Sequence, residues 1–408
     1  MRFTIVSQYY PPEIGAAQVR LSAMARELSH RGHQVQVITA MPNYPEGTVR
    51  EGYRGKAWQC EYVDGIPVFR TWIYPATGRS TPKRLACYFS FAFSSIFGLL
   101  RVPRAEVVFV ESPPLFLGFS GWLVAALRQQ RFCLNISDLW PDSVVALGSM
   151  TEGVLVRAAY WLELWLYRRA WRVCGATEGI VESLITRKEV ERKKVLFLPN
   201  GVDTESFRPL PYDEVYATKL GLGGRKVFAY TGLHGYAQGL DVVIDAADRL
   251  RNRDDLTFLF VGEGPEKPRL QQICRDRQLP NVSFLAGQPT SQMPSIYALT
   301  TACIVPLRDI DLFQGARPSK IFPALACGKP VIFSGSGEAA RLIEQAHCGL
   351  VTPPENAAAL AVAIEQLADF PEEAIRMGQN GRAFVEQNLS WGRIMETWLG
   401  QITHDEGH

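Results

Sequence analysis

Two basic side chains, Arg317 and Lys320, lie in the stretch G-A-R-P-S-K-I-F-P at positions 315–323. The residues after them predict a short apolar helix over 321–327 that ends before Gly328. A loop that enters a helix in an open α/β sheet presents free backbone N–H groups and the positive end of the helix dipole to an anion. With two cations added, the stretch predicts a site for a diphosphate-like group. The alternative is an ordinary connection with solvated basic residues.

A carboxylate, Asp138, follows a predicted strand over 132–135. Side chains at the ends of parallel strands lie at the edge of the sheet where such folds bind ligands. Asp138 is therefore placed to orient a hydroxyl group or to stabilise positive charge on a reacting carbon. The alternative is that it caps the helix that follows.

The elements that would position these groups begin with a β-α-β unit, made of a strand over 3–7, a helix that ends at 30–32 and a strand over 34–39. The first loop, Q-Y-Y-P-P-E-I-G-A-A, then lies at the carboxyl edge of a parallel sheet. Gly15 in this loop would let the backbone approach a ligand closely, or would only relieve a tight turn. The next loop, over 41–56, is long and rich in turn residues. We interpret it as an acceptor-side lid or as a surface loop without function.

The second half of the chain repeats this plan with a strand over 226–230, the glycine-rich loop T-G-L-H-G-Y-A-Q-G-L-D and a helix from about residue 241. A chain of 408 residues is long enough for two separate cores. We expect an α/β fold with two doubly wound Rossmann-like domains facing a cleft. The expected domains are 1–203 and 204–388, and residues 389–408 form a C-terminal helix that crosses back to the first domain.

Charge is divided unevenly along a chain whose net charge is only +2. Residues 1–200 hold 24 Lys and Arg against 16 Asp and Glu, and the rest hold 19 against 25. No basic block or aromatic-basic ladder suggests a nucleic-acid partner, so an anionic membrane surface fits the basic half better.

The eight cysteines are scattered, without a C-x-x-C pair or partner histidines, which argues against a disulfide framework or a metal site. Met1 leads directly into an apolar strand, without the features of a signal peptide, so we expect a cytoplasmic protein. We separately expect a reaction that needs no metal or other cofactor.

Two aromatic segments could lie at that membrane surface. The first, over 85–100, is uncharged, is flanked by basic residues and places Phe89, Phe93, Ile96 and Leu100 on one helical face. The second, over 154–172, alternates tryptophans with arginines, namely Trp161, Trp165 and Trp171 with Arg157, Arg168, Arg169 and Arg172. This composition is typical of helices in a lipid interface, although core helices of a large sheet can share it.

Seven motifs follow one another across almost the whole chain: S-Q-Y-Y-P-P-E-I-G-A-A, M-P-N-Y-P-E-G, D-L-W-P-D-S, L-P-N-G-V-D, A-Q-G-L-D, V-G-E-G-P and P-S-K-I-F. In this order the chain resembles the retaining glycosyltransferases of family four. Within them it is similar to the bacterial fucosamine-type transferases of capsule, colanic acid and O-antigen assembly. The resemblance implies a first domain that binds a polyprenyl-diphosphate-linked saccharide at the inner face of the plasma membrane. The second domain would bind a nucleotide sugar, a UDP-sugar by the same resemblance.

The resemblance, together with the residue patterns, also implies roles for individual residues. The catalytic residues would be Asp138, Lys320 and Arg317. The donor would contact Gly15, Gly232, His234, Gly235, Gln238, Glu263, Gly315, Pro318 and Ser319. The acceptor would contact Tyr10, Glu13, Asn43 and Tyr44. A retaining transferase of this kind needs no strong protein base if a donor phosphate oxygen accepts the proton.

The chain departs from the family pattern at several of its charged positions. Gly315 and Pro323 stand where the family has two glutamates, and Leu233 and Gln238 stand where it has a phosphate-binding Arg and Lys. Asp138 or a neighbour replaces the usual first-domain histidine. These departures leave two alternatives, a catalytically degenerate transferase that acts as a scaffold and a nucleotide-sugar epimerase. The stretch G-S-G-E-A-A over 335–340 also matches a dinucleotide fingerprint, but a lone match is weak.

Overall fold

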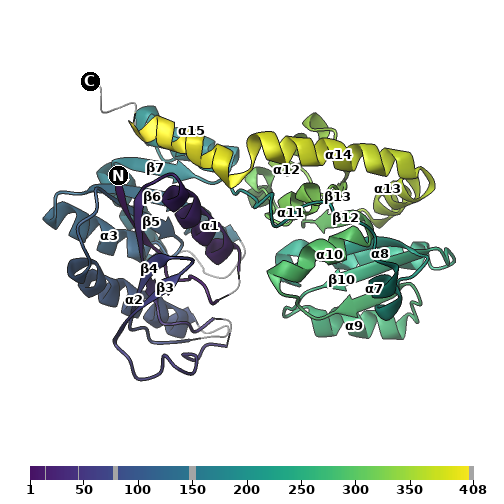
Figure 1. The fold of residues 1–408 in the computed structure, drawn as a ribbon, viewed down its shortest axis with the longest axis horizontal. Helices are drawn as coiled ribbons and strands as arrows, with labels where there is room; N and C mark the ends of the chain where they lie inside the picture. The colour runs from purple at the N-terminus through teal and green to yellow at the C-terminus, as the bar shows by residue number, and fades with distance from the viewer. Residues whose placement is uncertain (14, 45, 77–80, 147–152, 404–408) are drawn as a thin grey trace. The chain divides into compact units, whose positions relative to one another are not determined.

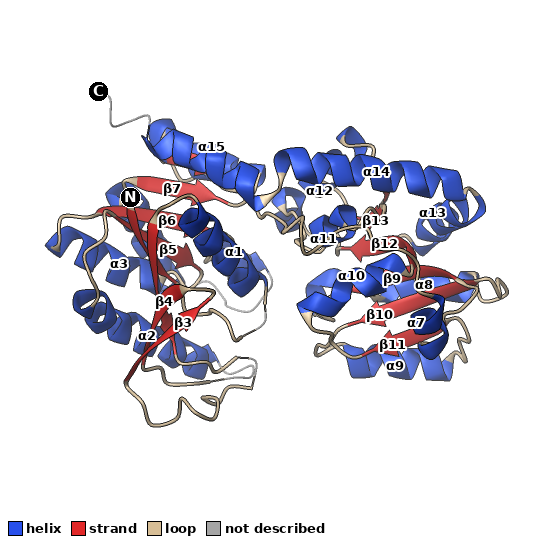
Figure 2. Cartoon of the chain, viewed as in Figure 1, coloured by secondary structure: helices blue, strands red, loops and turns tan. Residues whose placement is uncertain are grey.

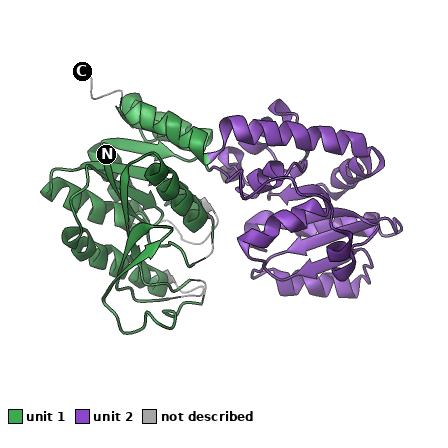
Figure 3. Ribbon diagram, in the orientation of Figure 1, with its two compact units in different colours: residues 1–200, 391–408 green, residues 201–390 purple. Residues whose placement is uncertain are grey.

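The computed structural model describes residues 1–13, 15–44, 46–76, 81–146 and 153–403. The chain forms two compact units (Figure 3). Unit 1 contains residues 1–200 and 391–408, and unit 2 contains residues 201–390. Within the described residues, every helix is too short or too polar to cross a bilayer.

Unit 1 is an eight-stranded sheet with helices on both faces (Figures 1 and 2). Its strands are β1 Arg2–Val6, β2 Gln34–Ala40, β3 Trp58–Val63, β4 Ile66–Thr71, β5 Val107–Ser112, β6 Arg131–Ile136, β7 Arg172–Gly175 and β8 Val195–Phe197. Its helices are α1 Ala16–His30, α2 Thr81–Arg101, α3 Phe116–Leu127, α4 Asp142–Ala146, α5 Val154–Arg169, α6 Glu178–Thr186, the 3-10 helix η1 Arg192–Lys194 and α15 Trp391–Thr403.

The strand order in unit 1 is β3-β4-β2-β1-β5-β6-β7-β8, and only the β3–β4 pair is antiparallel among the described strands. The inner strands are continuous apolar runs because helices cover both of their faces. Helices α2, α3, α5 and α6 pack on one face around a core that includes Val110, Leu134 and Leu166. Helices α1 and α15 pack together on the other face.

Helix α15 completes unit 1 although it lies far along the chain. Trp398 is buried between Phe3 of β1 and Phe109 of β5, with ring centroids 6.0 and 5.8 Å away. Its indole N–H donates to Cys174 Sγ of β7 at 3.3 Å. The helix therefore covers the middle of the sheet with its largest apolar side chain.

Unit 2 has a six-stranded sheet of order β11-β10-β9-β12-β13-β14, in which each described pair is parallel. The strands are β9 Lys226–Thr231, β10 Leu256–Val261, β11 Val282–Leu285, β12 Thr300–Pro306, β13 Val331–Ser334 and β14 Gly349–Thr352. The helices are α7 Glu214–Lys219, η2 Tyr236–Gln238, α8 Asp241–Arg249, α9 Lys267–Asp276, η3 Thr290–Gln292, α10 Met293–Ala298, η4 Asp311–Gly315, α11 Ile321–Ala326, α12 Glu338–Gln345, α13 Ala357–Asp369 and α14 Pro371–Asn388.

These elements confirm the predicted α/β class with two Rossmann-like sheets, and they correct the sequence analysis at two points. The segment over 154–172 is not one helix, because α5 ends at Arg169 and Arg172 begins strand β7. In addition, no helix was predicted between residue 204 and the strand over 226–230, but α7 lies there, with its N-terminus capped by the Asp213 side chain.

Candidate functional site

Lys320 stands at the carboxyl edge of the unit 2 sheet, as the residue before α11. Its ammonium donates to the hydroxyl of Tyr230 at 2.6 Å and lies 4.4 Å from the centre of the Tyr230 ring. Tyr230 is a buried residue of β9, and its hydroxyl donates in turn to the Leu233 carbonyl. Burial lowers the pKa of Lys320 to about 7, because the charged form loses solvation that a phenol cannot replace. An anion that bound here would restore the charge.

Arg317 has a different environment from the one that the sequence suggested. Its guanidinium forms an ion pair with Glu338, the buried first residue of α12. Glu338 lies in the G-S-G-E stretch, so this acid neutralises Arg317 and anchors the loop before α11. The diphosphate clamp made of Arg317 and Lys320 stays a prediction, in which Arg317 contributes from within an ion pair with Glu338.

Two glycine positions explain how the loops of this edge fit together. Gly262 and Gly264 have φ of +142° and +157°, which disfavour any other residue. A Cβ on Gly262 would lie 2.0 Å from the Gly232 carbonyl oxygen, and one on Gly264 would lie 2.4 Å from the His234 carbonyl oxygen. The V-G-E-G loop after β10 thus packs backbone against backbone on the loop after β9.

His234, which was predicted to contact the donor, is fully buried. Its ring packs against Tyr230, Phe260 and Phe284, with centroids 5.4, 6.1 and 6.3 Å away. Burial lowers the pKa of His234 to about 4, so the imidazole is neutral at pH 7. Among the described residues neither ring nitrogen has a hydrogen-bond partner. In this conformation His234 is part of the aromatic core under the loop.

Other residues that were expected to contact the donor form hydrogen bonds within and between the loops at this edge of the sheet. Gln238 Oε1 accepts a hydrogen bond from Gly235 N at 3.1 Å. Glu263 accepts from Lys267 Nζ at 3.0 Å and from the backbone of Gly287 at 3.1 Å. Nearer to Lys320, Gly315 is the last residue of η4, and Pro318 and Ser319 form the turn that enters α11.

The carboxyl edge of the unit 1 sheet contains a buried polar network around Glu111, a residue absent from the expected site. Glu111 accepts from Arg20 of α1, from Asn135 Nδ2 at 2.8 Å and from Ser137 Oγ at 2.7 Å. Arg20 also donates to Asn200 Oδ1 at 2.8 Å. The signal in the sequence is a carboxylate at the end of a buried strand, as for Asp138. The network fixes the first turns of α1 against β5 and β6.

Gly15 precedes α1 with extended backbone, at φ 174°. A Cβ at this position would meet only the flexible side chain of Gln18, at 2.6 Å from Oε1. Neither the backbone conformation nor a neighbouring backbone atom therefore requires a glycine.

The expected acceptor residues Tyr10, Glu13 and Asn43 are buried, and Tyr44 is exposed. Glu13 accepts backbone hydrogen bonds from Tyr10 at 3.3 Å and from Asn43 and Tyr44 at 2.8 Å each. Burial raises the pKa of the Glu13 carboxyl, and these N–H groups oppose the shift. Glu13 thus ties the first loop to the loop after β2. Tyr44 remains the member of the set that faces solvent, while Pro45 of the same motif lies outside the described residues.

Asp138 is exposed in the turn between β6 and α4. Desolvation and, to a smaller extent, the nearby Asp142 raise the pKa of its carboxyl, while hydrogen bonds with Ser143 and with the Leu139 backbone oppose the shift. Its neighbour Ser137 belongs to the Glu111 network, so the turn that carries Asp138 is fixed at one side. The position suits a carboxylate that contacts a ligand at this edge.

The expectation of a metal-free reaction needs one qualification from the sequence itself. An Asp-x-Asp pair does occur, at Asp309 and Asp311 after β12. Asp309 N donates to Glu355 Oε2 at 3.4 Å, and Asp311 begins η4. In the described part of the chain, no group of three or more His, Cys, Asp or Glu residues is arranged to hold a metal ion.

Comparisons with known proteins agree with this architecture. Residues 15–201 match the glycosyl transferase 4-like domain, and residues 214–384 match the glycosyl transferases group 1 family. A putative colanic acid biosynthesis glycosyl transferase, WcaI of Escherichia coli, is 28% identical over 414 residues, which cover 98% of this chain and all of that protein. The probable glycosyltransferase WbjE of Pseudomonas aeruginosa is 22% identical over 316 residues, which cover 76% of this chain and 78% of that protein.

Solved structures share the fold at low sequence identity. A sucrose-phosphate synthase from Thermosynechococcus elongatus superposes with a TM-score of 0.78 at 18% identity, over 99% of this chain and 98% of its own. Anabaena HepE in complex with UDP and glucose superposes with a TM-score of 0.74 at 17% identity, over 98% of this chain and 99% of its own.

Proposed function

The chain is a glycosyltransferase with the GT-B fold, and we propose that it is a retaining enzyme of cell-surface polysaccharide biosynthesis. In this proposal it moves a sugar from a UDP-sugar, such as an N-acetylated deoxyhexosamine donor, to a polyprenyl-diphosphate-linked saccharide. The support is the end-to-end similarity to a putative colanic acid glycosyl transferase and the motif order along the chain. A fold neighbour that was crystallised with UDP and glucose supports the donor class.

The observation that carries the proposal is the environment of Lys320. Its ammonium is held by Tyr230, at the carboxyl edge of a parallel sheet and at a helix N-terminus. A diphosphate oxygen at this position would accept a charge-assisted hydrogen bond. As the bond between the sugar and the diphosphate breaks, negative charge builds up on the leaving group, and Lys320 would stabilise it there.

On the acceptor side, the proposal uses the α1 N-terminus and Asp138. Gly15 would allow a phosphate or a sugar to approach the helix end, since in the described part of unit 1 a Cβ there would meet only the flexible Gln18 side chain. Asp138 would orient the attacking hydroxyl or stabilise positive charge on the anomeric carbon. In a retaining reaction that proceeds on one face of the sugar, a phosphate oxygen of the donor takes the proton from that hydroxyl, so no protein base is needed.

A polyprenyl-linked acceptor requires a surface that approaches the membrane, and α2 offers one. Phe93 and Phe97 of this helix are 63% and 54% exposed, and Phe89 and Leu100 are exposed on the same face. We call these four residues the α2 aromatic face. Aromatic rings that stay in water on a helix with basic residues at both ends are typical of binding to a lipid interface.

The proposal is tested by calorimetry of the purified protein with UDP, GDP, ADP and TDP, with and without Mg²⁺. We expect UDP to bind most tightly. Replacing the ammonium in Lys320→Met should weaken binding by about tenfold or more, since a charge-assisted hydrogen bond contributes roughly 1.5–3 kcal/mol. Lys329→Met is the matched control, because Lys329 is also partly buried with a lowered pKa but precedes β13, at the opposite edge.

The calorimetry results distinguish a donor site at Lys320 from a degenerate scaffold and from a metal-dependent enzyme. Binding of UDP that Lys320→Met weakens and Lys329→Met does not supports the donor site. No binding of any diphosphate would favour the degenerate scaffold. A requirement for Mg²⁺ would remove the metal-independent part of the proposal and direct attention to Asp309 and Asp311.

A further inference from the structure

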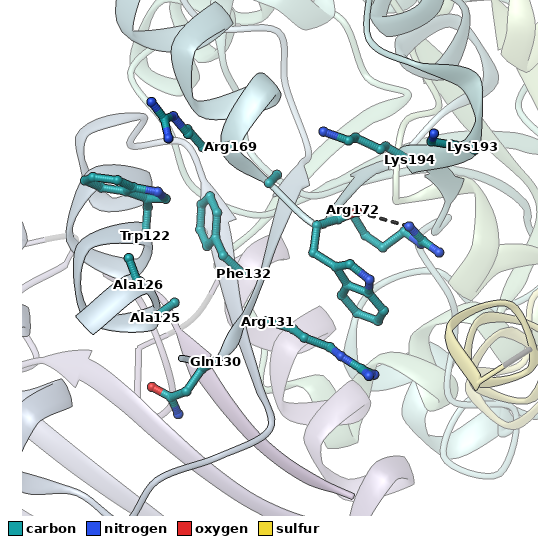
Figure 4. Close-up of a pocket in the computed structure, with 12 residues that line it drawn as sticks. Trp122, Ala125, Ala126, Gln130, Arg131, Phe132, Arg169, Arg172, Lys193 and Lys194 are labelled. Carbon is teal, nitrogen blue, oxygen red and sulfur yellow. Dashed lines mark hydrogen bonds between the residues drawn. The ribbon is translucent and has the colours of Figure 1, made fainter. Parts of the chain in front are cut away.

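A pocket of about 520 Å³ opens at the amino edge of the unit 1 sheet, away from the residues discussed so far (Figure 4). Arg131 begins β6, Arg172 begins β7, and Lys194 directly precedes β8. These strands are parallel neighbours, so their first residues lie at one edge. Asp138 follows the other end of β6, about 20 Å away at the usual rise per strand residue. The pocket is therefore too far from Asp138 to hold the group that reacts there.

The lining of this pocket is strongly basic. It includes five cations, and none of the twelve described lining residues is an Asp or a Glu. The cations come from four separate elements, β6, α5, β7 and η1; they are Arg131, Arg169, Arg172, Lys193 and Lys194. Lys193 also pairs at 3.2 Å with Glu191, which does not line the pocket. A concentration of positive charge from four elements attracts an anion. We call this site the basic pocket.

The guanidinium groups in the basic pocket are held in place by indole rings. Arg131 and Arg172 both lie against the Trp171 ring, 4.9 and 4.8 Å from its centre. Arg169 lies 5.5 Å from the Trp165 ring centre. Lys194 Nζ donates to the Arg168 carbonyl at 3.1 Å. Arginines fixed by stacking lose little further freedom when their planar forks bind a phosphate, so these contacts prepare the pocket for one.

An aromatic cluster continues from the basic pocket to the surface. Trp122 lines the pocket and packs edge-to-face on Trp165, with centroids 4.4 Å apart. Phe119 and Trp161 pack on this pair and are 42% and 65% exposed. Indole rings beside arginines are a combination that suits the boundary between phosphate headgroups and acyl chains. A small soluble phosphate compound has no acyl chains for these exposed rings to contact.

We propose that the basic pocket binds the headgroup phosphate of an anionic phospholipid while the aromatic cluster enters the lipid interface. The inference deepens the membrane-surface part of the proposed function and rests on it. It adds a specific phosphate site, on α5, β6, β7 and η1, to the general electrostatic attraction between a basic unit 1 and an anionic membrane. The site would orient unit 1 on the membrane without taking part in sugar transfer.

The test compares two double variants of equal charge in the full-length protein. Arg169→Gln with Lys193→Gln removes two cations from the basic pocket. Arg168→Gln with Arg192→Gln removes the adjacent exposed cations, which do not line the pocket. Binding is measured by co-sedimentation with phosphatidylcholine vesicles that contain phosphatidylglycerol, and by calorimetry with soluble glycerol phosphate. UDP affinity, which depends on unit 2, is measured on the same preparations to test the proposed function separately.

We expect the pocket variant to lose vesicle binding by at least about tenfold, because charge-assisted hydrogen bonds to phosphate are lost. The control should lose less than about threefold through weaker long-range attraction. Equal losses in the two variants, or no loss in either, would overturn the inference. Binding of glycerol phosphate that only the pocket variant loses, with vesicle binding retained, would also overturn it, by identifying a site for free phosphate.

Discussion

The environment of Lys320 sets a pKa that binding of an anion would change. Its burial beside a neutral phenol keeps its pKa near 7, about three units below that of a lysine in water. The protein therefore holds this amine only partly charged at neutral pH. A diphosphate would favour the charged form, so binding of the nucleotide and binding of a proton should assist each other.

The first prediction follows from that coupling. Between pH 7 and pH 9 the affinity for the nucleoside diphosphate should fall, approaching about tenfold per pH unit, because the free amine loses its proton above its pKa. Calorimetry at pH 8 in two buffers of different ionisation enthalpy should reveal proton uptake on binding. Lys320→Arg should abolish both effects, since a guanidinium stays charged throughout this range. A wild-type affinity that is independent of pH would contradict the prediction.

The sequence could indicate Lys320 as a candidate anion-binding residue because its position before a helix follows from the neighbouring residues alone. It could not indicate the partners, which come from far along the chain. Tyr230 is 90 residues away from Lys320, and Glu338, which neutralises Arg317, lies beyond the next strand. His234 shows the same limit, because a histidine in a glycine-rich loop looks exposed until the strands on both sides bury it. Pairing and burial of this kind are set by tertiary packing.

At the scale of elements, α2 has two faces with different roles. The side chains that pack on the sheet, such as Phe91 and Leu99, are buried in the unit 1 core. The α2 aromatic face points away from that core, and its four side chains are between 42% and 63% exposed. Phe89 also packs on Phe116 of α3, with ring centroids 4.2 Å apart, so α3 covers only this end of the face. When a helix is apolar on two faces and packs only one of them on a sheet, the second face favours an apolar partner or surface.

The second prediction concerns this face. Phe93→Ser with Phe97→Ser should reduce binding to anionic vesicles by about tenfold or more, because each buried aromatic ring contributes roughly 1.5–3 kcal/mol. The free energy of unfolding should be almost unchanged, because both rings are already mostly exposed to water in the folded protein. Val362→Ser with Ile375→Ser, on exposed positions of unit 2, is the control. Equal vesicle binding by the two double variants would refute the proposed role of α2.

Most central strands could be predicted from the sequence, because buried parallel strands are short runs of β-branched and aromatic residues. The strands predicted over 34–39 and 226–230 each differ from the observed strands, β2 Gln34–Ala40 and β9 Lys226–Thr231, by one residue at the end. The β3–β4 hairpin was missed because β3, at the sheet edge, carries a mixed pattern of polar and apolar residues with little burial. Strand β7 was missed as well, because R-V-C-G directly follows a helix rich in Trp and Arg and is only four residues long.

At the scale of the whole molecule, unit 1 is discontinuous in sequence. Its sheet comes from the first 200 residues, and α15 returns to it after unit 2 has been completed. Trp398 lies among Phe3, Phe109 and Cys174 and joins three strands of the sheet through one side chain. The stability of unit 1 should therefore depend on a residue that follows the last helix of unit 2.

The third prediction tests this dependence. Trp398→Ala should destabilise unit 1 by about 3–5 kcal/mol, through lost burial and the cavity that remains. Hydrogen exchange should accelerate in peptides from β1 and β5 and stay unchanged in peptides from β10, which separates the two units. Trp161→Ala, at an exposed tryptophan of the same unit, should cost less than about 1 kcal/mol. Uniform acceleration across both units would contradict a local role for Trp398.

The return of α15 also sets an order of events during protein synthesis. When residue 200 leaves the ribosome, another 190 residues must be translated before the α15 segment begins. At bacterial or eukaryotic elongation rates this takes roughly 10–40 s. Throughout that time the nascent sheet exposes the apolar surface that Trp398 will cover. Synthesis of unit 2 therefore delays the completion of the unit 1 core until α15 has been translated.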